Sequence, residues 1–393
     1  MQQALKSELR GGPSVVLHVG TMKSGTSYLQ AVLRRNAKSL ATVGVLVPKN
    51  MGPAVANILE RSGSTKKSKV KGGWQRFLDS VESWDGPLVV ASHEFLGNAT
   101  PDEARAVIDT LQGRPVRIVI TCRDLLRVIP SHWQTTIKNG GTVPFPSYVQ
   151  LLLAEDEDAG EDAHRYATGF WRNHDLPELV RSWAGAVGLE NVVLVTIPPP
   201  GSSLDLLWHR FADAAGLPPF DCDFKADAKS NVSLTYAETE MLRSVNMSVR
   251  RTMSQTEYQQ IVNKYLANRL LRRAPDSERS IDRPIFGRES HQRVRRRADE
   301  LVDALSDLPV EVVGSLEELR VAPYQGAPDG GDSRGPLDPI PEPVADTIAN
   351  LLGRLARTER ELAVLRGESV KRRRQRRKGK LTKTLDDDLP PDS

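Results

Sequence analysis

The sequence predicts an α/β fold in which a central parallel sheet has helices on both faces. Four short apolar runs rich in β-branched residues, each bounded by turn-forming residues, are typical of buried strands. They cover residues 15–19, 88–91, 116–121 and 192–197. Amphipathic stretches separate these runs, and such an alternation of strands and helices is typical of a parallel sheet.

The stretches between the predicted strands are amphipathic and predict helices. The first begins near Thr26, where Leu29, Val32 and Leu33 would face the sheet. Further helices are expected over residues 101–111, 177–187 and 204–215. Residues 236–273 predict a long, polar helix or helix pair, as do residues 290–305. The later part of the body is therefore expected to be mostly helical.

Composition divides the 393 residues into a long body and a short appended end. We expect an N-terminal tail at residues 1–14 and one α/β domain at residues 15–325. Residues 326–343 contain five Pro and four Gly, which is typical of a linker. The leucines within residues 344–370, spaced by four and three, predict a helical C-terminal extension. That spacing suits a short coiled coil, and a helix packed on its own body fits equally well. Residues 371–393 follow as a basic, disordered tail.

The net charge of +4 comes from this tail, where nine Lys and Arg face four Asp. The remaining 370 residues carry 45 basic and 46 acidic side chains. A body so close to neutrality has no general electrostatic surface for nucleic acid, so we expect no specific nucleic-acid partner. The tail could contact an anionic membrane surface or only aid solubility.

The cysteine content and the N-terminus indicate a cytoplasmic protein. Cys122 and Cys222 are too few for a disulfide framework, and two isolated cysteines do not have the spacing of a zinc site. Residues 1–14 lack an apolar leader segment, and no run approaches the roughly 20 apolar residues of a membrane span. We therefore expect a cytoplasmic location, with the tail as a possible peripheral membrane contact.

The strongest local signal is residues 15–30, with the sequence VVLHVGTMKSGTSYLQ. A glycine-containing loop that opens a helix presents free backbone N–H groups and the positive end of the helix dipole to an anion. Gly20 and Gly25 have the spacing of a Walker A loop, but Thr26 stands where that motif requires Lys. Lys23 instead lies within the loop. The alternative is a glycine-serine turn that binds no ligand.

The segment Lys23-Ser24-Gly25-Thr26-Ser27 resembles the 5′-phosphosulfate loop of the sulfotransferase family. The resemblance implies a P-loop-like sulfotransferase fold and 3′-phosphoadenosine 5′-phosphosulfate (PAPS) as the sulfuryl donor, with no metal. It covers about residues 14–320 and becomes weaker toward the end. The GxxGxxK-type element of cytosolic animal members is not evident, so the adenine contacts stay unassigned.

A second pair of residues supports this resemblance. In the family, an Arg after a strand and a Ser eight residues later, at a helix start, hold the 3′-phosphate of the donor. Arg123 and Ser131 have that spacing here, after the strand predicted at residues 116–121. An Arg offers a planar fork to phosphate oxygens, and a Ser adds a hydroxyl. Leu125 stands where a Pro often follows the Arg-Asp pair of the family.

The chemistry of sulfuryl transfer assigns roles to a few of these residues. Lys23 would stabilise the leaving phosphate and the transferred group, while the N–H groups of residues 24–27 form the cradle. A base must accept the proton of the acceptor, and the family uses Glu or His. Glu94 and His93 follow the strand at residues 88–91, at the edge where ligands bind in open α/β sheets. Either one, or another residue, could be this base.

The expected acceptor is a hydroxyl of a carbohydrate, a glycolipid or a secondary metabolite, by resemblance to bacterial members of the family. Two other functions stay open. One is a P-loop kinase that uses ATP and magnesium on a small molecule. The other is a non-enzymatic binding protein that forms homo-oligomers through residues 344–366 and binds through its basic tail.

Overall fold

The computed structural model describes residues 12–60, 72–154, 160–203, 205–224, 234–249, 253–270, 284–325, 343–362 and 364–365. The predicted N-terminal tail, apart from its last residues, lies outside these ranges, as do the linker up to residue 342 and the basic tail. The chain divides into two compact units. The first comprises residues 1–136, 143–237 and 275–337, and the second comprises residues 137–142, 238–274 and 338–393. The domain boundaries expected from composition stay a prediction.

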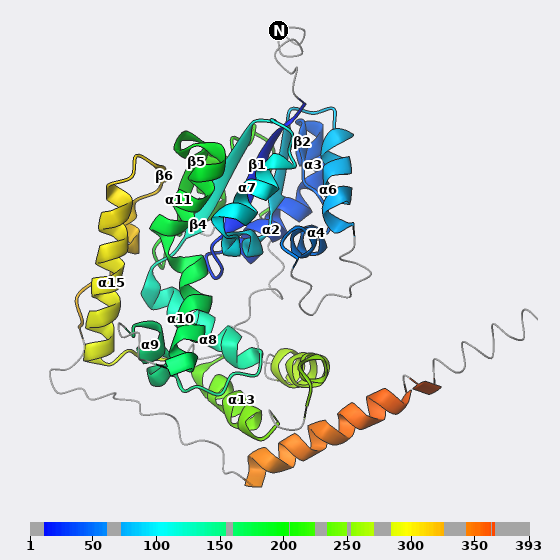
Figure 1. Cartoon of the computed structure of the whole chain (residues 1–393), viewed down its shortest axis with the longest axis vertical. Coiled ribbons are helices and arrows are strands. Elements are labelled where there is room, and N and C mark those ends of the chain that lie inside the picture. Colours follow the sequence, from blue (N-terminus) through cyan, green and yellow to red (C-terminus); the bar gives the residue numbers. More distant parts are fainter. Residues whose placement is uncertain are drawn as a thin grey trace, which may run out of the picture. The chain divides into compact units, whose positions relative to one another are not determined.

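The first unit is an α/β unit built on a six-stranded sheet in which every neighbouring pair is parallel. The strand order is β2-β3-β1-β4-β5-β6 (Figure 1). The strands are β1 (Ser14–Gly20), β2 (Val45–Leu46), β3 (Leu88–Ser92), β4 (Val116–Cys122), β5 (Val192–Thr196) and β6 (Glu311–Val313). The four strands that the sequence predicts are therefore confirmed. They form the centre of the sheet, and the two short strands at its edges were not predicted.

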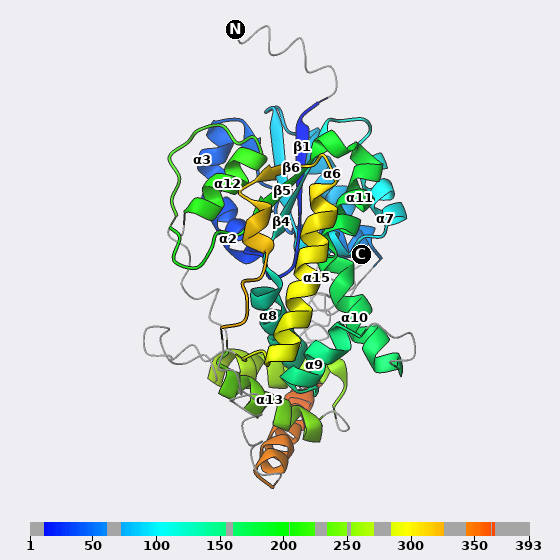
Figure 2. The same ribbon diagram turned by 90° about the vertical axis from the view of Figure 1, so that its left-hand side faces the viewer.

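Helices cover both faces of this sheet, as predicted. The described helices of the first unit are α2 (Thr26–Arg35), α3 (Ala37–Thr42), α4 (Met51–Ile58), α6 (Gly73–Glu82), α7 (Pro101–Asp109), α8 (Leu125–Lys138), α9 (Phe145–Leu152), α10 (Gly160–His174), α11 (Leu176–Val187), α12 (Leu206–Ala214) and α15 (Arg288–Ser306). The described residues of the unit also form the short 3₁₀ helices η1 (Glu94–Asn98), η2 (Leu189–Asn191) and η6 (Leu316–Leu319). Figure 2 shows α2, α3 and α12 on one side of the sheet and α6, α7 and α11 on the other.

Two apolar cores hold these layers together. Alternate residues of one strand point to opposite faces, so Val15 and Leu17 of β1 belong to one core while Val16 belongs to the other. The first core includes Trp74, from α6, and α7, α11 and α15 also contribute to it. The second core is formed with α2, α3 and α12. Because both faces are covered, the strands are almost wholly apolar, as parallel sheets require.

The described part of the second unit is mostly helical, in accord with the helix or helix pair expected within residues 236–273. It contains α13 (Tyr236–Val249), α14 (Gln255–Tyr258), the π-helix η4 (Gln259–Leu270) and the helical residues 343–362 and 364–365. Buried Asn246 joins residues 137–142 to this unit, because its Nδ2 donates to the carbonyls of Ile137 (2.7 Å) and Gly141 (2.8 Å). The hydroxyl of Tyr258 donates to Asn246 Oδ1 at 2.7 Å. These bonds explain how a short segment far from α13 in sequence becomes part of its unit.

The helix predicted within residues 344–370 is present over its described part. The leucines spaced by four and three along this helix are solvent-exposed, with 59 % of Leu351 and 60 % of Leu365 accessible. Homo-oligomer formation through residues 344–366 stays a prediction.

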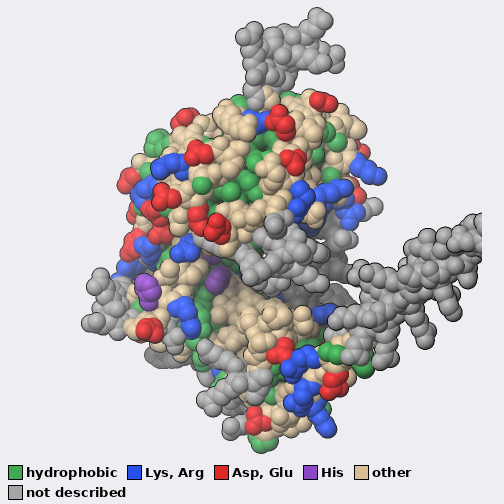
Figure 3. All heavy atoms as spheres, turned by 45° about the vertical axis from the view of Figure 1, so that its right-hand side comes forward, with side chains coloured by type: hydrophobic (Ala, Val, Ile, Leu, Met, Phe, Trp, Pro, Cys, Tyr) green, Lys and Arg blue, Asp and Glu red, His purple; other side chains and the backbone are tan. Residues whose placement is uncertain are grey.

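The protein surface has a mixed charge. Figure 3 shows acidic and basic side chains intermixed on the face that it presents, in accord with the near-neutral body. In the part of the chain that the structure describes, no helix is both long enough and apolar enough to span a membrane.

Candidate active site

The loop between β1 and α2 has a backbone that depends on glycine at two positions. Gly20 has φ +108°, and a Cβ there would lie 3.1 Å from Glu94 Cα. Gly25 has φ +78°, and a Cβ there would lie 2.6 Å from Leu207 Cδ2. Both values lie in the region that side chains disfavour. Glycine at these positions lets the loop approach the end of β3 on one side and α12 on the other.

Lys23 also has a positive φ, at +64°. This conformation is uncommon for a residue with a side chain and costs of order 1–3 kcal/mol. The surrounding structure therefore has to hold Lys23 inside the loop. Its side chain is half-buried.

A chain of buried hydrogen bonds anchors the loop to the sheet. Ser24 Oγ donates to the carbonyl of Thr21 at 2.5 Å and shares a 2.7 Å hydrogen bond with Thr121 Oγ1. His18 Nε2 lies 3.1 Å from the same Thr121 hydroxyl, and His18 Nδ1 lies 2.8 Å from Ser92 Oγ. Burial lowers the pKa of His18 to about 4, against a smaller opposing effect of Glu94. His18 is therefore a neutral residue of β1 that links this strand to β3 and β4. The Ser24 hydroxyl is directed toward Thr121 of β4.

The first turn of α2 is suited to an anion. Gly25 precedes the helix, so no side chain caps the turn, and no acidic residue lies in it. Uncapped N–H groups at a helix start favour a negative charge. Thr26 is buried and Ser27 is exposed. Because the Ser24 side chain is engaged within the loop, its part in the predicted cradle is limited to its backbone.

Two histidines lie near Lys23, and the sequence did not single them out as site residues. Burial and, to a smaller degree, the charge of Lys23 lower the pKa of His132 to about 4. Burial, His132 and Lys23 together lower the pKa of His174 well below its usual value. The two imidazoles are 5.9 Å apart, and His132 Nδ1 shares a 2.6 Å hydrogen bond with Tyr148 Oη. At neutral pH both rings are uncharged, so Lys23 remains the positive group among these three.

Arg123 lies beside the loop, and its assignment to the 3′-phosphate stays a prediction. It follows β4, and its Nη1 donates to the carbonyl of Lys23 at 3.3 Å. The next residue, Asp124, caps α8 by accepting a 3.0 Å hydrogen bond from the N–H of Arg127, with which it also forms an ion pair. Arg123 thus contacts the loop, while Asp124 caps the helix. α8 begins at Leu125, the position at which Pro is common in the family.

Ser131 lies elsewhere in its helix than the resemblance implied. It follows Pro130 well inside α8, whereas the family pattern implies a position at the helix start. The helix begins earlier because Asp124 caps it directly after the strand. Ser131 is half-buried, and its carbonyl accepts from Thr135 Oγ1 at 3.1 Å. Its contribution to a 3′-phosphate site stays a prediction.

Glu94 and His93, at the end of β3, have different surroundings. Glu94 Oε2 accepts a 2.9 Å hydrogen bond from Gln30 Nε2, on α2. Burial raises the pKa of Glu94, but His93, a backbone hydrogen bond, Gln30 and His18 together bring it below its usual value. His93 lies against α4, where a Cβ on Gly52 would be 3.2 Å from His93 Nε2. Burial lowers the pKa of His93, against a smaller opposing effect of Glu94.

The hydrogen bond of His93 fixes its neutral form. Its Nδ1 accepts from the N–H of Phe95 at 3.3 Å, so the ring proton of the neutral imidazole is on Nε2. Glu94, in contrast, is ionised at neutral pH and can accept a proton.

Asn173 connects the loop to Glu94, and the sequence analysis missed it. Its Oδ1 accepts from the N–H of Met22 at 2.5 Å, and its Nδ2 donates to the carbonyl of Glu94 at 3.5 Å. Asn173 and His174 are both buried on α10. Polar residues on a face shared with Phe170 are the signal that could have identified them, although only tertiary packing shows what they contact.

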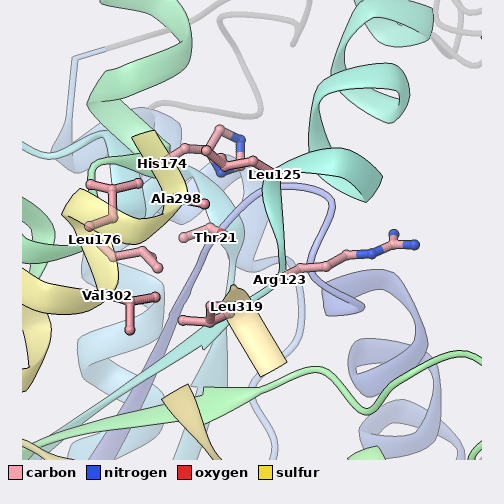
Figure 4. A pocket seen from close by; sticks show the side chains of 9 residues that line it. Thr21, Arg123, Leu125, His174, Leu176, Ala298, Val302 and Leu319 are labelled. Carbon is pink, nitrogen blue, oxygen red and sulfur yellow. The ribbon is translucent and has the colours of Figure 1, made fainter. Parts of the chain in front are cut away.

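A small cavity lies behind the loop, with a volume of about 20 Å³. Thr21, Arg123 and His174 line it together with apolar side chains of α11, α15 and η6 (Figure 4). In Figure 4 the guanidinium of Arg123 points away from this space. His174 Nε2 is buried and has no hydrogen-bond partner among the described residues. A cavity of this size accommodates one water molecule, which would satisfy that nitrogen.

Among the described residues, no group of three or more His, Cys, Asp or Glu side chains could hold a metal ion.

Comparison with known proteins gives little beyond this geometry. No family model and no curated protein sequence matches the chain. A crystal structure of a sulfotransferase from Alicyclobacillus acidocaldarius matches with a TM-score of 0.39 and 13 % sequence identity. The match covers 60 % of this chain and 92 % of that one.

Proposed function

We propose that the protein is a sulfotransferase that moves a sulfuryl group from PAPS to a hydroxyl group. The observation that carries this proposal is the position of Lys23 inside a loop that ends at the uncapped start of α2. A sulfuryl group carries less charge than a γ-phosphate, so one lysine and backbone donors can stabilise it without a metal ion.

The residues present suit an adenosine bisphosphate derivative. The start of α2 and Lys23 would hold the 5′-phosphosulfate, and Arg123 with Ser131 would hold the 3′-phosphate. Arg123 already lies against the loop through its bond to the Lys23 carbonyl.

Glu94 is the base that the geometry favours. As sulfur is attacked in line, the acceptor hydroxyl must lose its proton. Glu94 is ionised at neutral pH, and Gln30 orients its carboxylate. In neutral His93 the Nδ1 lone pair is engaged by Phe95, so this ring presents a donor at Nε2. Lys23 would stabilise the charge that develops on the departing 5′-phosphate.

The Glu94→Gln variant should lower the transfer rate by about 10²–10⁴-fold, which is the usual contribution of a general base. Its affinity for 3′,5′-bisphosphoadenosine should stay unchanged, because glutamine keeps the volume and can still accept from Gln30. His93→Ala, assayed in parallel, should retain much more activity. A large loss in His93→Ala with an active Glu94→Gln variant would assign the base to His93.

The proposal is tested by thermal unfolding with two nucleotides. We expect 3′,5′-bisphosphoadenosine to raise the melting temperature without magnesium, because binding to the native state alone stabilises it. ATP with magnesium should have a smaller effect. Stabilisation by ATP and magnesium alone would instead support the P-loop kinase.

The acceptor we propose is a hydroxyl of a carbohydrate, glycolipid or secondary metabolite, in a cytoplasmic enzyme. Cell extract would be incubated with the protein and PAPS that carries labelled sulfate. The molecule that becomes labelled would be the acceptor. Homo-oligomers through residues 344–366 and membrane contact through the basic tail remain proposals. Deletion of residues 344–393 should leave donor binding intact, whereas a protein that acts through its tail would lose its activity.

A further inference from the structure

A second pocket in the first unit lies between α15, α10 and the end of α9, and its volume is about 310 Å³. Three of the side chains that line it are arginines of α15: Arg293, Arg296 and Arg297. They are spaced by three and four residues, which places them on one face of a helix. Because none of the predicted donor-site residues lines this pocket, we treat it as a separate site and call it the arginine pocket.

The walls of the arginine pocket are held in place by contacts within the protein. The Arg297 guanidinium lies 4.9 Å from the centre of the Trp171 ring and forms ion pairs with Asp175 (3.0 Å) and Glu300 (3.1 Å). Trp171 Nε1 donates to the carbonyl of Leu152 at 2.8 Å. Both planar groups are therefore oriented before any ligand binds, and such pre-organisation lowers the cost of binding.

The other two arginines differ in their contacts. Arg293 donates to the carbonyl of Leu153, at the end of α9. Arg296 is exposed and has no hydrogen bond or ion pair with the described residues. Its guanidinium is thus available for an external anion, while its two neighbours shape the pocket around it.

The chemistry and the size of the pocket define a class of ligand. Guanidinium groups match the oxygens of phosphate and sulfate groups with paired N–H donors. A volume of about 310 Å³ is many times the roughly 30 Å³ share of one water molecule and reaches the lower range of small-molecule pockets. An inorganic anion alone would leave most of that space empty. Glu300, at the same pocket, offers carboxylate oxygens to hydroxyl groups.

We propose that the arginine pocket binds a phosphate or sulfate ester of a small polyhydroxylated molecule, such as a sugar. The ester group would contact Arg296, and hydroxyl groups would donate to Glu300. This site is independent of the phosphate loop and does not require the proposed sulfotransferase activity.

The test uses the full-length protein and isothermal titration with glucose 6-phosphate, glucose 6-sulfate and glucose. At least one ester should bind, and glucose should bind far more weakly. Arg296→Gln should weaken binding of the ester about tenfold, the usual effect of removing one charge-assisted hydrogen bond. Binding of only one ester would support the site and show whether its ligand is a phosphate or a sulfate.

Arg295→Gln is the matched control. Arg295 lies on the same helix, does not line the pocket and contacts Asp299 at 3.9 Å. The same charge is removed, so binding should change less than twofold. Lys23→Ala should leave ester binding unchanged as well. The proposal is overturned if neither ester binds, if Arg295→Gln and Arg296→Gln weaken binding equally, or if Lys23→Ala alone abolishes it.

Discussion

Lys23→Ala is expected to reduce sulfuryl transfer about 10³-fold, because removing one donor aimed at developing charge has an effect of this order. Lys23 is the charged group within the loop, and the neighbouring His132 and His174 are neutral at the pH of the assay. Arg123, which contacts the Lys23 carbonyl, is the other positive group beside the loop, and we assign it to the 3′-phosphate. The measurement is turnover of labelled PAPS with an acceptor identified from the extract screen.

The control for this variant is Lys38→Ala, which removes an exposed lysine on α3. It should retain the wild-type rate. Circular dichroism and melting temperature should show that Lys23→Ala still folds, because alanine removes a half-buried side chain from outside the two cores. Wild-type turnover in Lys23→Ala would contradict the role assigned to Lys23.

Arg123→Ala is expected to weaken binding of 3′,5′-bisphosphoadenosine by roughly 10–100-fold, since hydrogen bonds to charged groups contribute about 1.5–3 kcal/mol. Binding of adenosine 5′-phosphate, which lacks the 3′-phosphate, should weaken much less. The comparison matters because Arg123 also donates to the Lys23 carbonyl. A loosened loop would affect both nucleotides, whereas a lost phosphate contact affects only one of them.

Arg117→Ala provides the control, because Arg117 lies on β4, the strand that Arg123 follows. Arg117 forms its ion pair with Glu311 at 2.6 Å and is absent from the site. Affinity for both nucleotides should stay the same in this variant. If Arg123→Ala weakens both nucleotides to the same degree, its assignment to the 3′-phosphate is wrong.

The centre of the sheet could be predicted because its strands carry their own signal. The run Val15–Leu17, for example, is apolar because both faces of the strand are buried. The edge strands β2 and β6 have only two and three residues, and the β6 side chains are exposed or half-buried. Their pairing depends on neighbouring strands, so no periodicity in the sequence indicates them.

The site was partly predictable because one part of it, the loop, carries a local signal in the sequence. The loop from Gly20 to Gly25 is a local feature, and its glycines and Lys23 are visible in the sequence. Gln30 and Asn173 reach Glu94 from α2 and α10. Such contacts between distant segments are set by packing, and a single sequence contains no spacing that indicates them.

The most direct test of the central claim is a crystal structure of the protein with 3′,5′-bisphosphoadenosine. We predict that the 5′-phosphate lies at the start of α2, within hydrogen-bond distance of Lys23 Nζ, and that no divalent ion accompanies it. A structure in which the Lys23 amine points into solvent, or in which the 5′-phosphate lies away from this loop, would contradict the account.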